Sequence, residues 1–523
     1  MPDFLERFGE RKPDGTPFFG NMRSGLIVAM VCRTHHPPDA FSLTNMYQLS
    51  IGTLVGALVA APVADRFGRR LSVSFWSLIV SVGFLIQIAT SRQWYVIMIG
   101  RIVAGLGVGA LSLLVPMYQA ETAPPWIRGA LVSTYQLFIT LGIFLAAIIN
   151  YATYESVPNS TASWRITIGL GWLWTLILGV GVLFFPETPR YAYRKGRVDE
   201  ARETLMKVYG APAHHYSIYT QMEEIEAKLR GESKIKGNPI SEGIKMFRAP
   251  RMAYRIALGV GLQMFQQLTG ANYFFYYGTT IFESVGISNS YITQMILNGI
   301  NFGVTFIGLY LVEHYGRRKS LIAGSMWMFV CFLVFASVGH FVLDPEDASA
   351  TPVAGTVLIV FACLFILGYA TTWGPMVWAI IAELFPSRYR AKGMALSTAS
   401  NWTWNFLLAF FTPFITGAID FRYGYVFAAC NLMGGLIVYF FVVEGQGRSL
   451  EEIDTMYLER VPPRKSSKWT PPPAEEMARI RKEAGTEVAD PGNEVERGTL
   501  SGETERGAGA DANKYEHTHA ERV

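Results

Sequence analysis

Four amide side chains interrupt one long apolar stretch of the sequence: Gln263, Gln266, Gln267 and Asn272. The three glutamines and position 270 share one face of a helix, because their spacing is i, i+3, i+4 and i+7. An amide carries both a donor and an acceptor, so it matches a ligand with neutral hydroxyl groups. Among hydrocarbon chains it is costly unless it is satisfied. The alternative for any single glutamine is that it holds neighbouring helices together.

Two charged patterns occur twice, in the same order, in the two halves of the chain. Residues 65–70 (DRFGRR) are echoed by 313–318 (EHYGRR), and Glu121 with Arg128 is echoed by Glu383 with Arg390. An acid followed by a basic cluster would form ion pairs that join neighbouring helix ends. The alternative is that these charges only set orientation in a membrane. The ordered repetition favours ion pairs and two related helix bundles, which is the construction of secondary transporters.

The composition predicts that these residues lie in a membrane protein. Of the 523 residues, 50% are apolar and 16% are charged, against about 25% charged residues in soluble domains. Mean hydropathy is +0.24. The net charge of +4 forms no basic stripe, so soluble enzymes and nucleic-acid binders are disfavoured. The four cysteines show no paired spacing, and neither a disulfide framework nor a metal site is expected.

Apolar runs of about 20 residues predict transmembrane helices. We expect them near residues 71–90, 94–117, 130–151, 164–185, 254–282, 291–312, 320–342, 353–381, 394–418 and 423–443. A further run, 49–63, is too short by itself.

Lysines and arginines in the short connections predict the orientation. One set of connections contains Arg66, Arg69, Arg70, Arg128, Arg317, Arg318, Lys319, Arg388, Arg390 and Lys392. The opposite set holds little beyond Arg92 and Arg422. The richer side is predicted to be cytoplasmic, which places segment 186–250 and the C-terminus inside.

The chain divides into five segments by composition. We expect an outer loop remnant at 1–24, an N-terminal transmembrane bundle at 25–185, a cytoplasmic helical linker at 186–250, a C-terminal transmembrane bundle at 251–443, and a cytoplasmic, largely disordered tail at 444–523. Helices are predicted at 198–209 and 219–230 within the linker. The tail after residue 458 is rich in Pro, Gly, Glu and Arg and lacks apolar periodicity.

As an ordered set, the motifs of this chain resemble the sugar porters of the major facilitator superfamily, closest to fungal monosaccharide transporters. The motifs are residues 65–70, Gly100-Arg101, Glu121 with Arg128-Gly129, 186–190 (PETPR), 263–272 (QMFQQLTGAN), 313–318, 373–375 (WGP) and 383–386 (ELFP). The resemblance covers roughly residues 20–457. It implies an all-α polytopic membrane fold of two six-helix bundles, with about eleven spans here, joined by a cytoplasmic helical linker. It also implies alternating access to a sugar site between the halves.

The resemblance assigns sugar binding to side chains from several spans: Gln136, Gln266, Gln267, Asn272, Asn301, Trp378 and Asn405. The helix that carries Trp378 is expected to bend at Gly374-Pro375, and its indole ring would stack on the C–H face of a sugar. Gly270 suggests a second, locally loosened helix, which is tolerated where it lines a cavity. Asn401 and Trp402 are weaker candidates.

The resemblance also implies a set of charges that govern the conformational cycle: Asp65, Arg69, Arg101, Glu121, Arg128, Glu187, Arg190, Glu313, Arg317, Glu383 and Arg390. In proton-coupled members, the arginine that matches Arg101 pairs with an aspartate of the first transmembrane helix.

Two features depart from the family pattern. Residues 1–24 resemble the loop that follows the first helix, so that helix and its aspartate are not found in this sequence. Residues 31–48 read as a polar insertion, and their removal would join 25–30 to 49–52 in one apolar helix. We interpret them as a retained intron, because Val31-Cys32 and Gln48 are compatible with common fungal splice ends. The alternative is a real loop.

The sequence therefore predicts a plasma-membrane carrier of a monosaccharide, such as glucose, that is proton-coupled in its intact form. A sugar uniporter and a transporter-like glucose sensor are the alternatives. No enzymatic activity and no cofactor are expected, because the sequence shows neither a catalytic cluster nor a phosphate-binding motif. The expected partners are the sugar, protons and the lipid bilayer, without nucleic acid.

Overall fold

The computed structural model describes most of the chain. The described residues are 44–90, 93–124, 126–157, 160–232, 245–274, 290–343, 352–386 and 388–473, with four short pieces at 10–11, 17–18, 476–477 and 479–480. The predicted sequence features at Cys32 and at 31–43 lie outside the described residues.

Within the described residues, the architecture is all-α apart from one short antiparallel pair of strands. The N-terminal bundle contains α3 (Thr44–Phe67), α4 (Arg69–Ala89), α5 (Trp94–Thr122), α6 (Arg128–Ser156) and α7 (Ala162–Gly181), followed by η1 (Val182–Phe184). The C-terminal bundle contains α12 (Met252–Leu268), α14 (Ser290–His314), α15 (Arg317–Phe341), α16 (Pro352–Thr371), α17 (Trp373–Leu384), α18 (Arg390–Ile419), η3 (Asp420–Arg422) and α19 (Tyr423–Phe441). Strands β1 (Glu10–Arg11) and β2 (Pro17–Phe18) pair antiparallel.

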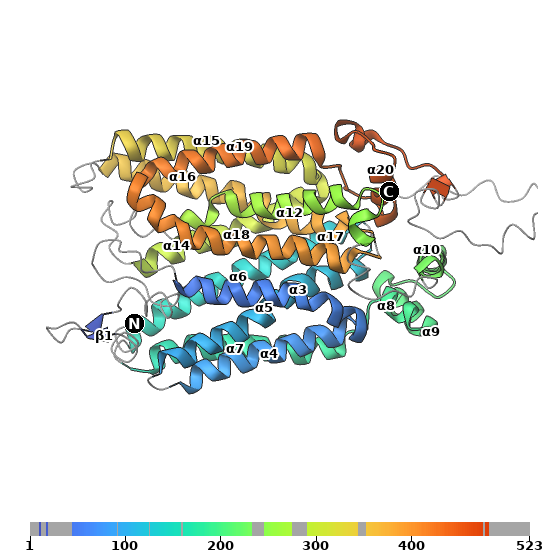
Figure 1. Ribbon diagram of the computed structural model, residues 1–523, viewed down its shortest axis with the longest axis horizontal. Coiled ribbons are helices and arrows are strands. Elements are labelled where there is room, and N and C mark those ends of the chain that lie inside the picture. The colour runs from blue at the N-terminus through green and yellow to red at the C-terminus, as the bar shows by residue number, and fades with distance from the viewer. Residues whose placement is uncertain are drawn as a thin grey trace, which may run out of the picture.

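The long helices of both bundles run in a common direction (Figure 1). Within the described residues, nine helical segments are long and apolar enough to cross a membrane, with α16 and α17 counted as one. Together with α12 and α18, they account for the spans expected from the sequence. The expected all-α membrane fold is confirmed.

The two bundles meet along two pairs of helices. α3 packs against α18, and α6 packs against α14. The short helix α17 contacts both α5 and α6. Side chains from these six helices therefore face one another between the halves, and this is where a ligand site that serves both bundles has to lie.

Glycines let α3 and α5 approach closely. A Cβ on Gly52 would lie 2.6 Å from the Ile102 carbonyl oxygen, and one on Gly105 would lie 2.6 Å from the Leu49 carbonyl oxygen. Both distances are too short for a real side chain, so the two backbones touch through glycine, as in other membrane helix pairs. This contact fixes α3 in the N-terminal bundle.

The span that was expected to be too short is a full helix. α3 has 24 residues, and its first turn begins at Thr44, inside the predicted insertion 31–48. Residues 44–48 therefore extend the helix that residues 49–63 alone could not complete. The rest of the predicted insertion lies outside the described residues.

Two helices of the C-terminal bundle are interrupted. α12 ends at Leu268, and Gly270 has a φ of 89°, a left-handed conformation that glycine adopts without strain. α16 and α17 are separated at Thr372, two residues before the Gly374-Pro375 bend that the sequence predicts. Both interruptions agree with the expected broken helices, and both leave backbone carbonyls open to side chains.

Short helices gather at one end of the molecule, on the right in Figure 1. They are α8 (Pro189–Arg194), α9 (Val198–Tyr209), α10 (Tyr216–Glu232), α20 (Leu450–Leu458) and η4 (Pro463–Lys468). We call this the basic end, because the repeated arginine motifs lie there. The bounds of α9 are those predicted, and α8, α9 and α10 share a small apolar core around Ala201 and Ile218.

Residues 444–473 differ from the disordered tail that the sequence predicts. The buried Ile453, Met456 and Tyr457 of α20 join the main apolar core. Arg255 donates to the Asp454 carboxylate at 2.5 Å and to the Asp454 carbonyl at 3.0 Å. The buried apolar residues of α20 are few and lie within one short helix, so the segment lacks the extended periodicity by which a sequence indicates a packed helix.

Candidate functional site

Amides from α12 and α18 form a connected cluster. Gln263, Gln266 and Asn401 are all at least 96% buried, at 0%, 2% and 4% exposed. The Asn401 side-chain amide donates to the side-chain oxygens of Gln263 and Gln266, the latter at 2.9 Å. Gln267 Nε2 donates to Asn401 Oδ1 at 3.0 Å. Asn401, a weak candidate from the sequence, is therefore the residue that joins the three glutamines.

The cluster continues through Gln267 toward the other bundle. Gln267 Oε1 accepts from Asn272 Nδ2 at 2.8 Å and from Asn405 Nδ2 at 3.4 Å. Ser50 of α3 donates to Asn405 Oδ1 at 3.3 Å. Sequence reasoning missed Ser50, because a single serine in an apolar span gives no distinguishing signal. This contact places the cluster at the boundary of the two bundles.

The interrupted helix α16–α17 is held by the same cluster. Gln266 Nε2 donates to the carbonyl oxygens of Trp373 and Gly374, both at 2.9 Å. Gln136 of α6 is buried beside Gly374, since a Cβ on that glycine would lie 3.6 Å from Gln136 Cγ. Gln136 and Gln266, both predicted from the resemblance, thus approach the same break in the helix from opposite bundles.

Aromatic rings lie beside this break. Trp378 of α17 packs edge-to-face on Tyr135 of α6, with ring centroids 5.2 Å apart. Trp402 Nε1 donates to Ser112 Oγ of α5 at 3.1 Å. Both pairs cross between the bundles, so the two tryptophans contact the N-terminal half although they belong to the C-terminal half.

Asn301 is placed differently from the other predicted binding residues. It is 4% exposed on α14, and within the described part of the chain it shares no hydrogen bond with the amide cluster. Its Oδ1, like Gln263 Nε2, is buried with no hydrogen-bond partner among the described residues. A buried polar atom without a partner is costly. These unused groups would be satisfied by a ligand that brings its own donors and acceptors.

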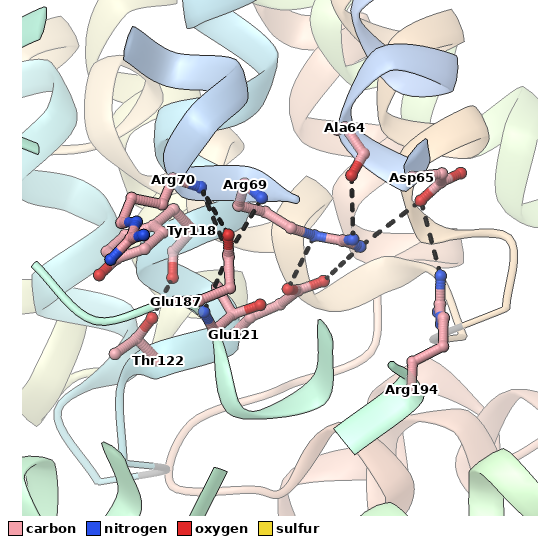
Figure 2. Close-up of polar contacts among 10 residues, drawn as sticks. Ala64, Asp65, Arg69, Arg70, Tyr118, Glu121, Thr122, Glu187 and Arg194 are labelled. Carbon is pink, nitrogen blue, oxygen red and sulfur yellow. Dashed lines mark hydrogen bonds and ion pairs between the residues drawn. The ribbon is translucent and has the colours of Figure 1, made fainter. Parts of the chain in front are cut away.

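The repeated acidic and basic residues of the N-terminal half form one network at the basic end (Figure 2). Arg69 donates to the Glu121 carboxylate at 3.1 Å and lies 3.6 Å from Asp65. Arg194 lies 3.7 Å from the same aspartate oxygen. Arg190 interacts electrostatically with Glu121. The expected ion pairs are therefore present in this half.

Glu187 in this network acts as a remote cap for α4. Its carboxylate accepts the backbone N–H of Arg69 at 3.0 Å and that of Arg70 at 3.2 Å. Gly68, the residue before the helix, has no side chain to satisfy these groups. Burial raises the pKa of the Glu187 carboxyl, and hydrogen bonds from the backbone N–H groups of Thr188, Arg70 and Arg69 act against that rise.

The C-terminal half repeats this arrangement with different residues. Arg317 donates to Glu383 at 3.1 Å, as Arg69 does to Glu121. Glu444 caps α15 by accepting the backbone N–H of Arg317 at 2.9 Å and that of Arg318 at 3.1 Å. Sequence reasoning selected Glu187 but missed Glu444. The signal was present, because each glutamate follows the last apolar residues of its bundle.

Arg128 and Arg390 occupy corresponding positions in the two halves and make corresponding contacts. Each is buried, and each donates from its side chain to the carbonyl oxygen five residues earlier, Ala123 or Phe385, at 3.3 Å. Arg128 interacts electrostatically with Glu383, and Arg390 interacts with Glu121. Each of these arginines is thus attracted electrostatically to a glutamate of the other half.

A direct hydrogen bond also joins the two halves at the basic end. Glu313 Oε1 accepts the backbone N–H of Ala130 at 3.1 Å. Gly129, the preceding residue, lies directly against the guanidinium of Arg317. The basic ends of the two bundles are therefore in contact in this structure.

Arg101 does not belong to these networks. It lies on α5, 20 residues before Glu121, which corresponds to about 30 Å along the helix. Its side chain is 7% exposed and its Nε has no hydrogen-bond partner among the described residues. No acidic side chain in the described part of the chain pairs with it.

Comparisons with known proteins agree on one family. The family model described as Sugar (and other) transporter matches residues 41–457. The chain is 42% identical over 465 residues to a Schizosaccharomyces pombe protein named high-affinity fructose transporter ght6, covering 88% of this chain and 83% of that protein. It is 43% identical over 471 residues to the Saccharomyces cerevisiae low-affinity glucose transporter HXT1, covering 90% and 79%.

A solved structure has the same fold. The proton:xylose symporter XylE of E. coli, bound to 6-bromo-6-deoxy-D-glucose, superposes with a TM-score of 0.68 at 25% identity. The match covers 78% of this chain and 88% of that one.

Proposed function

Because the chain belongs to the Sugar (and other) transporter family, we propose that it carries a hexose across the plasma membrane by alternating access. The relatives named above are a fructose and a glucose transporter, and the solved neighbour holds a glucose derivative. These names support a hexose as the substrate class of this chain.

The observation that carries the proposal is the amide cluster between the bundles. The buried Gln266 and Asn401 and the half-buried Gln267 present donors and acceptors in an uncharged setting. Sugar hydroxyl groups are both donors and acceptors, so they can replace the hydrogen bonds that these amides now make to one another. Asn301 Oδ1 and Gln263 Nε2 would gain partners when a sugar enters. Such a site discriminates strongly against analogues that lack a hydroxyl group.

The contact at the basic end supports alternating access. If the basic end is cytoplasmic, as its excess of lysine and arginine indicates, this structure is closed toward the cytoplasm. The networks around Glu121 and Glu383 would then hold the closed state and separate when the carrier opens inward.

Proton coupling is proposed from the family resemblance and requires a carboxylate that faces the site. Arg101 is the buried cation that such a carboxylate would stabilise. Since no acidic side chain of the described residues pairs with Arg101, a sugar uniporter is the second candidate.

The test is uptake of labelled glucose and fructose by liposomes that contain the purified chain. We expect saturable uptake that unlabelled hexose inhibits. With an inward proton gradient imposed across the liposome membrane, accumulation above the outside concentration that a protonophore abolishes identifies symport. Equilibration that the protonophore does not affect identifies uniport. Uptake no faster than in empty liposomes, from protein that is folded by circular dichroism, would contradict the proposal.

A further inference from the structure

A basic cluster lies where the last turn of α19 meets η4, away from the amides. Arg318 lies in the first turn of α15, and Arg464, Lys465 and Lys468 belong to η4. Within the described residues, neither Arg318 nor Arg464 forms a salt bridge. Glu444 attracts Arg318, but its buried carboxylate already accepts two backbone N–H groups of α15. Glu444 therefore offsets at most one of the four positive charges of the cluster.

Two guanidinium groups share one tyrosine ring in this cluster. Arg318 Cζ lies 5.3 Å and Arg464 Cζ 4.6 Å from the centroid of Tyr439. Arg318 Nη2 also donates to the Tyr439 carbonyl at 2.8 Å, which satisfies the end of α19. Arg464 and Arg318 repel each other, and like charges held this close favour an anion between or beside them.

The cluster lies at the edge of a membrane span. Tyr439, Phe440 and Phe441 form the last turn of the span that ends at Phe441, and they are 36%, 49% and 46% exposed. Exposed aromatic residues at the end of a membrane helix lie at the level of the lipid headgroups. The guanidinium groups stacked on Tyr439 and Phe440 therefore lie at the level of lipid phosphates.

We propose that Arg318 and Arg464, with Lys465 and Lys468 beside them, bind the phosphate of an anionic phospholipid headgroup. A guanidinium presents paired N–H donors that match phosphate oxygens. Clusters of basic residues directly beside a membrane span bind anionic lipids. The exposed rings of Phe440 and Phe441 would contact the acyl chains. This site is independent of the proposed sugar transport.

A titration of phosphatidylserine into the detergent-purified full chain, followed by native mass spectrometry, tests the proposal. Each basic residue near a membrane surface contributes about 1 kcal/mol, so Arg464→Gln should bind phosphatidylserine about fivefold more weakly than the parent. Lys468→Gln should weaken binding in the same direction. Arg202→Gln is the matched control, because Arg202 is exposed at the same end on α9, and it should leave binding unchanged.

Two further measurements separate the possible sources of the phosphate. Phosphatidylcholine should bind more weakly than phosphatidylserine, and inorganic phosphate should not displace the lipid at matched concentration. The proposal is overturned if Arg464→Gln and Lys468→Gln retain the parent's affinity for phosphatidylserine. It is equally overturned if inorganic phosphate alone occupies the cluster as tightly, because the ligand would then be a soluble anion.

Discussion

The side chain of Gln267 forms its hydrogen bonds in the described cluster with other amide side chains. Its side chain bonds to Asn272, Asn401 and Asn405, and none of these contacts links it to backbone. Gln266, in contrast, also holds two backbone carbonyls of the interrupted helix. Gln267 can therefore exchange its partners for a ligand without releasing a helix, whereas Gln266 cannot.

We expect Gln267→Ala to raise the half-saturation concentration for hexose uptake by roughly tenfold, because one or two hydrogen bonds of about 1 kcal/mol each are lost. The amount of folded protein should change little. Uptake of labelled hexose over a range of concentrations provides the measurement.

The control for this change is Gln87→Ala on α4. Gln87 is also an amide within a membrane span, 3% exposed where Gln267 is half-buried, but it bonds to the Gly83 carbonyl of its own helix at 3.1 Å. It should leave the half-saturation concentration unchanged. If Gln267→Ala also leaves it unchanged in well-folded protein, the amides serve to join helices and the sugar binds elsewhere.

The sequence indicated most of this site, because amides within an apolar span stand out by their cost. The predicted residues are close together in the structure. Gln267 bonds directly to Asn272 and Asn405, and Gln266 is linked to Gln267 through Asn401. The central role of Asn401 was underestimated. Its importance depends on how α18 is rotated against α12, and residue spacing within a single helix does not contain that rotation.

At the scale of helices, α4 and α15 each begin without a capping side chain of their own. Gly68 and Gly316 precede them, with φ of 93° and 83°, and a distant glutamate supplies the cap in both cases. A carboxylate at a helix N-terminus is stabilised by the helix dipole as well as by the N–H groups. The two glutamates therefore tie the last residues of each bundle to the start of an earlier helix.

We expect Glu444→Gln to lower the free energy of unfolding by about 1–2 kcal/mol, because charge-assisted hydrogen bonds to α15 are weakened. Glu187→Gln should have a similar effect through α4. Thermal unfolding of the purified variants measures both. The maximal rate of hexose uptake should fall more than the affinity for hexose, because the glutamates lie at the basic end and not at the amide cluster.

Glu200→Gln provides the comparison for these variants. Glu200 pairs with Arg197 at 2.8 Å on the surface of α9, and an exposed pair contributes little. Its loss should shift stability by less than about 0.5 kcal/mol. A loss of stability in Glu444→Gln no greater than that in Glu200→Gln would rule out the capping role.

The glycine before α15 is constrained by conformation and by space. A Cβ on Gly316 would lie 2.6 Å from Glu444 Oε2, and its φ is in the left-handed region. Gly316→Ala should therefore destabilise the protein by more than about 1 kcal/mol in thermal unfolding. Gly261→Ala in the middle of α12 should be neutral or stabilising, since a Cβ there meets no atom within 4 Å. Equal stability of the two variants would contradict this account.

The positions of the membrane helices could be predicted from the sequence, but residues 444–473 could not. Apolar runs define spans because a membrane requires them. The last segment is instead held by a few buried apolar residues of α20 and by single polar contacts. Ser466 Oγ accepts the backbone N–H of Glu444 at 2.9 Å, and Arg448 donates to the Trp469 carbonyl at 2.7 Å. Such contacts leave no periodic pattern in the sequence.

At the scale of the whole molecule, the two bundles close on each other at the basic end through a small contact surface. Gly129 of α6 lies against the Arg317 guanidinium, which is itself bound to Glu383 at 3.1 Å. The neighbouring Ala130 N–H is held by Glu313. A side chain at position 129 would have to displace this ion pair, so the closed arrangement depends on a glycine there.

We expect Gly129→Leu to favour the state that is open at the basic end. Overpacking of a close contact costs about 1–3 kcal/mol, and this cost falls on the closed state alone. Position 133 is suited to detect this opening. Ser133 is 0% exposed and lies one turn further along α6, between Gly129 and Gln136, so opening of the basic end would expose it to water. With the native cysteines replaced, a cysteine at position 133 should react with a water-soluble maleimide about tenfold faster in Gly129→Leu than in the parent.

Gly142→Leu on the same helix is the control, since a Cβ at Gly142 meets no atom within 4 Å. The cysteine at position 133 should react at the parent rate in this variant. Equal rates in all three proteins would mean that the contact at Gly129 does not hold the bundles closed, and the alternating-access proposal would then need another closing surface.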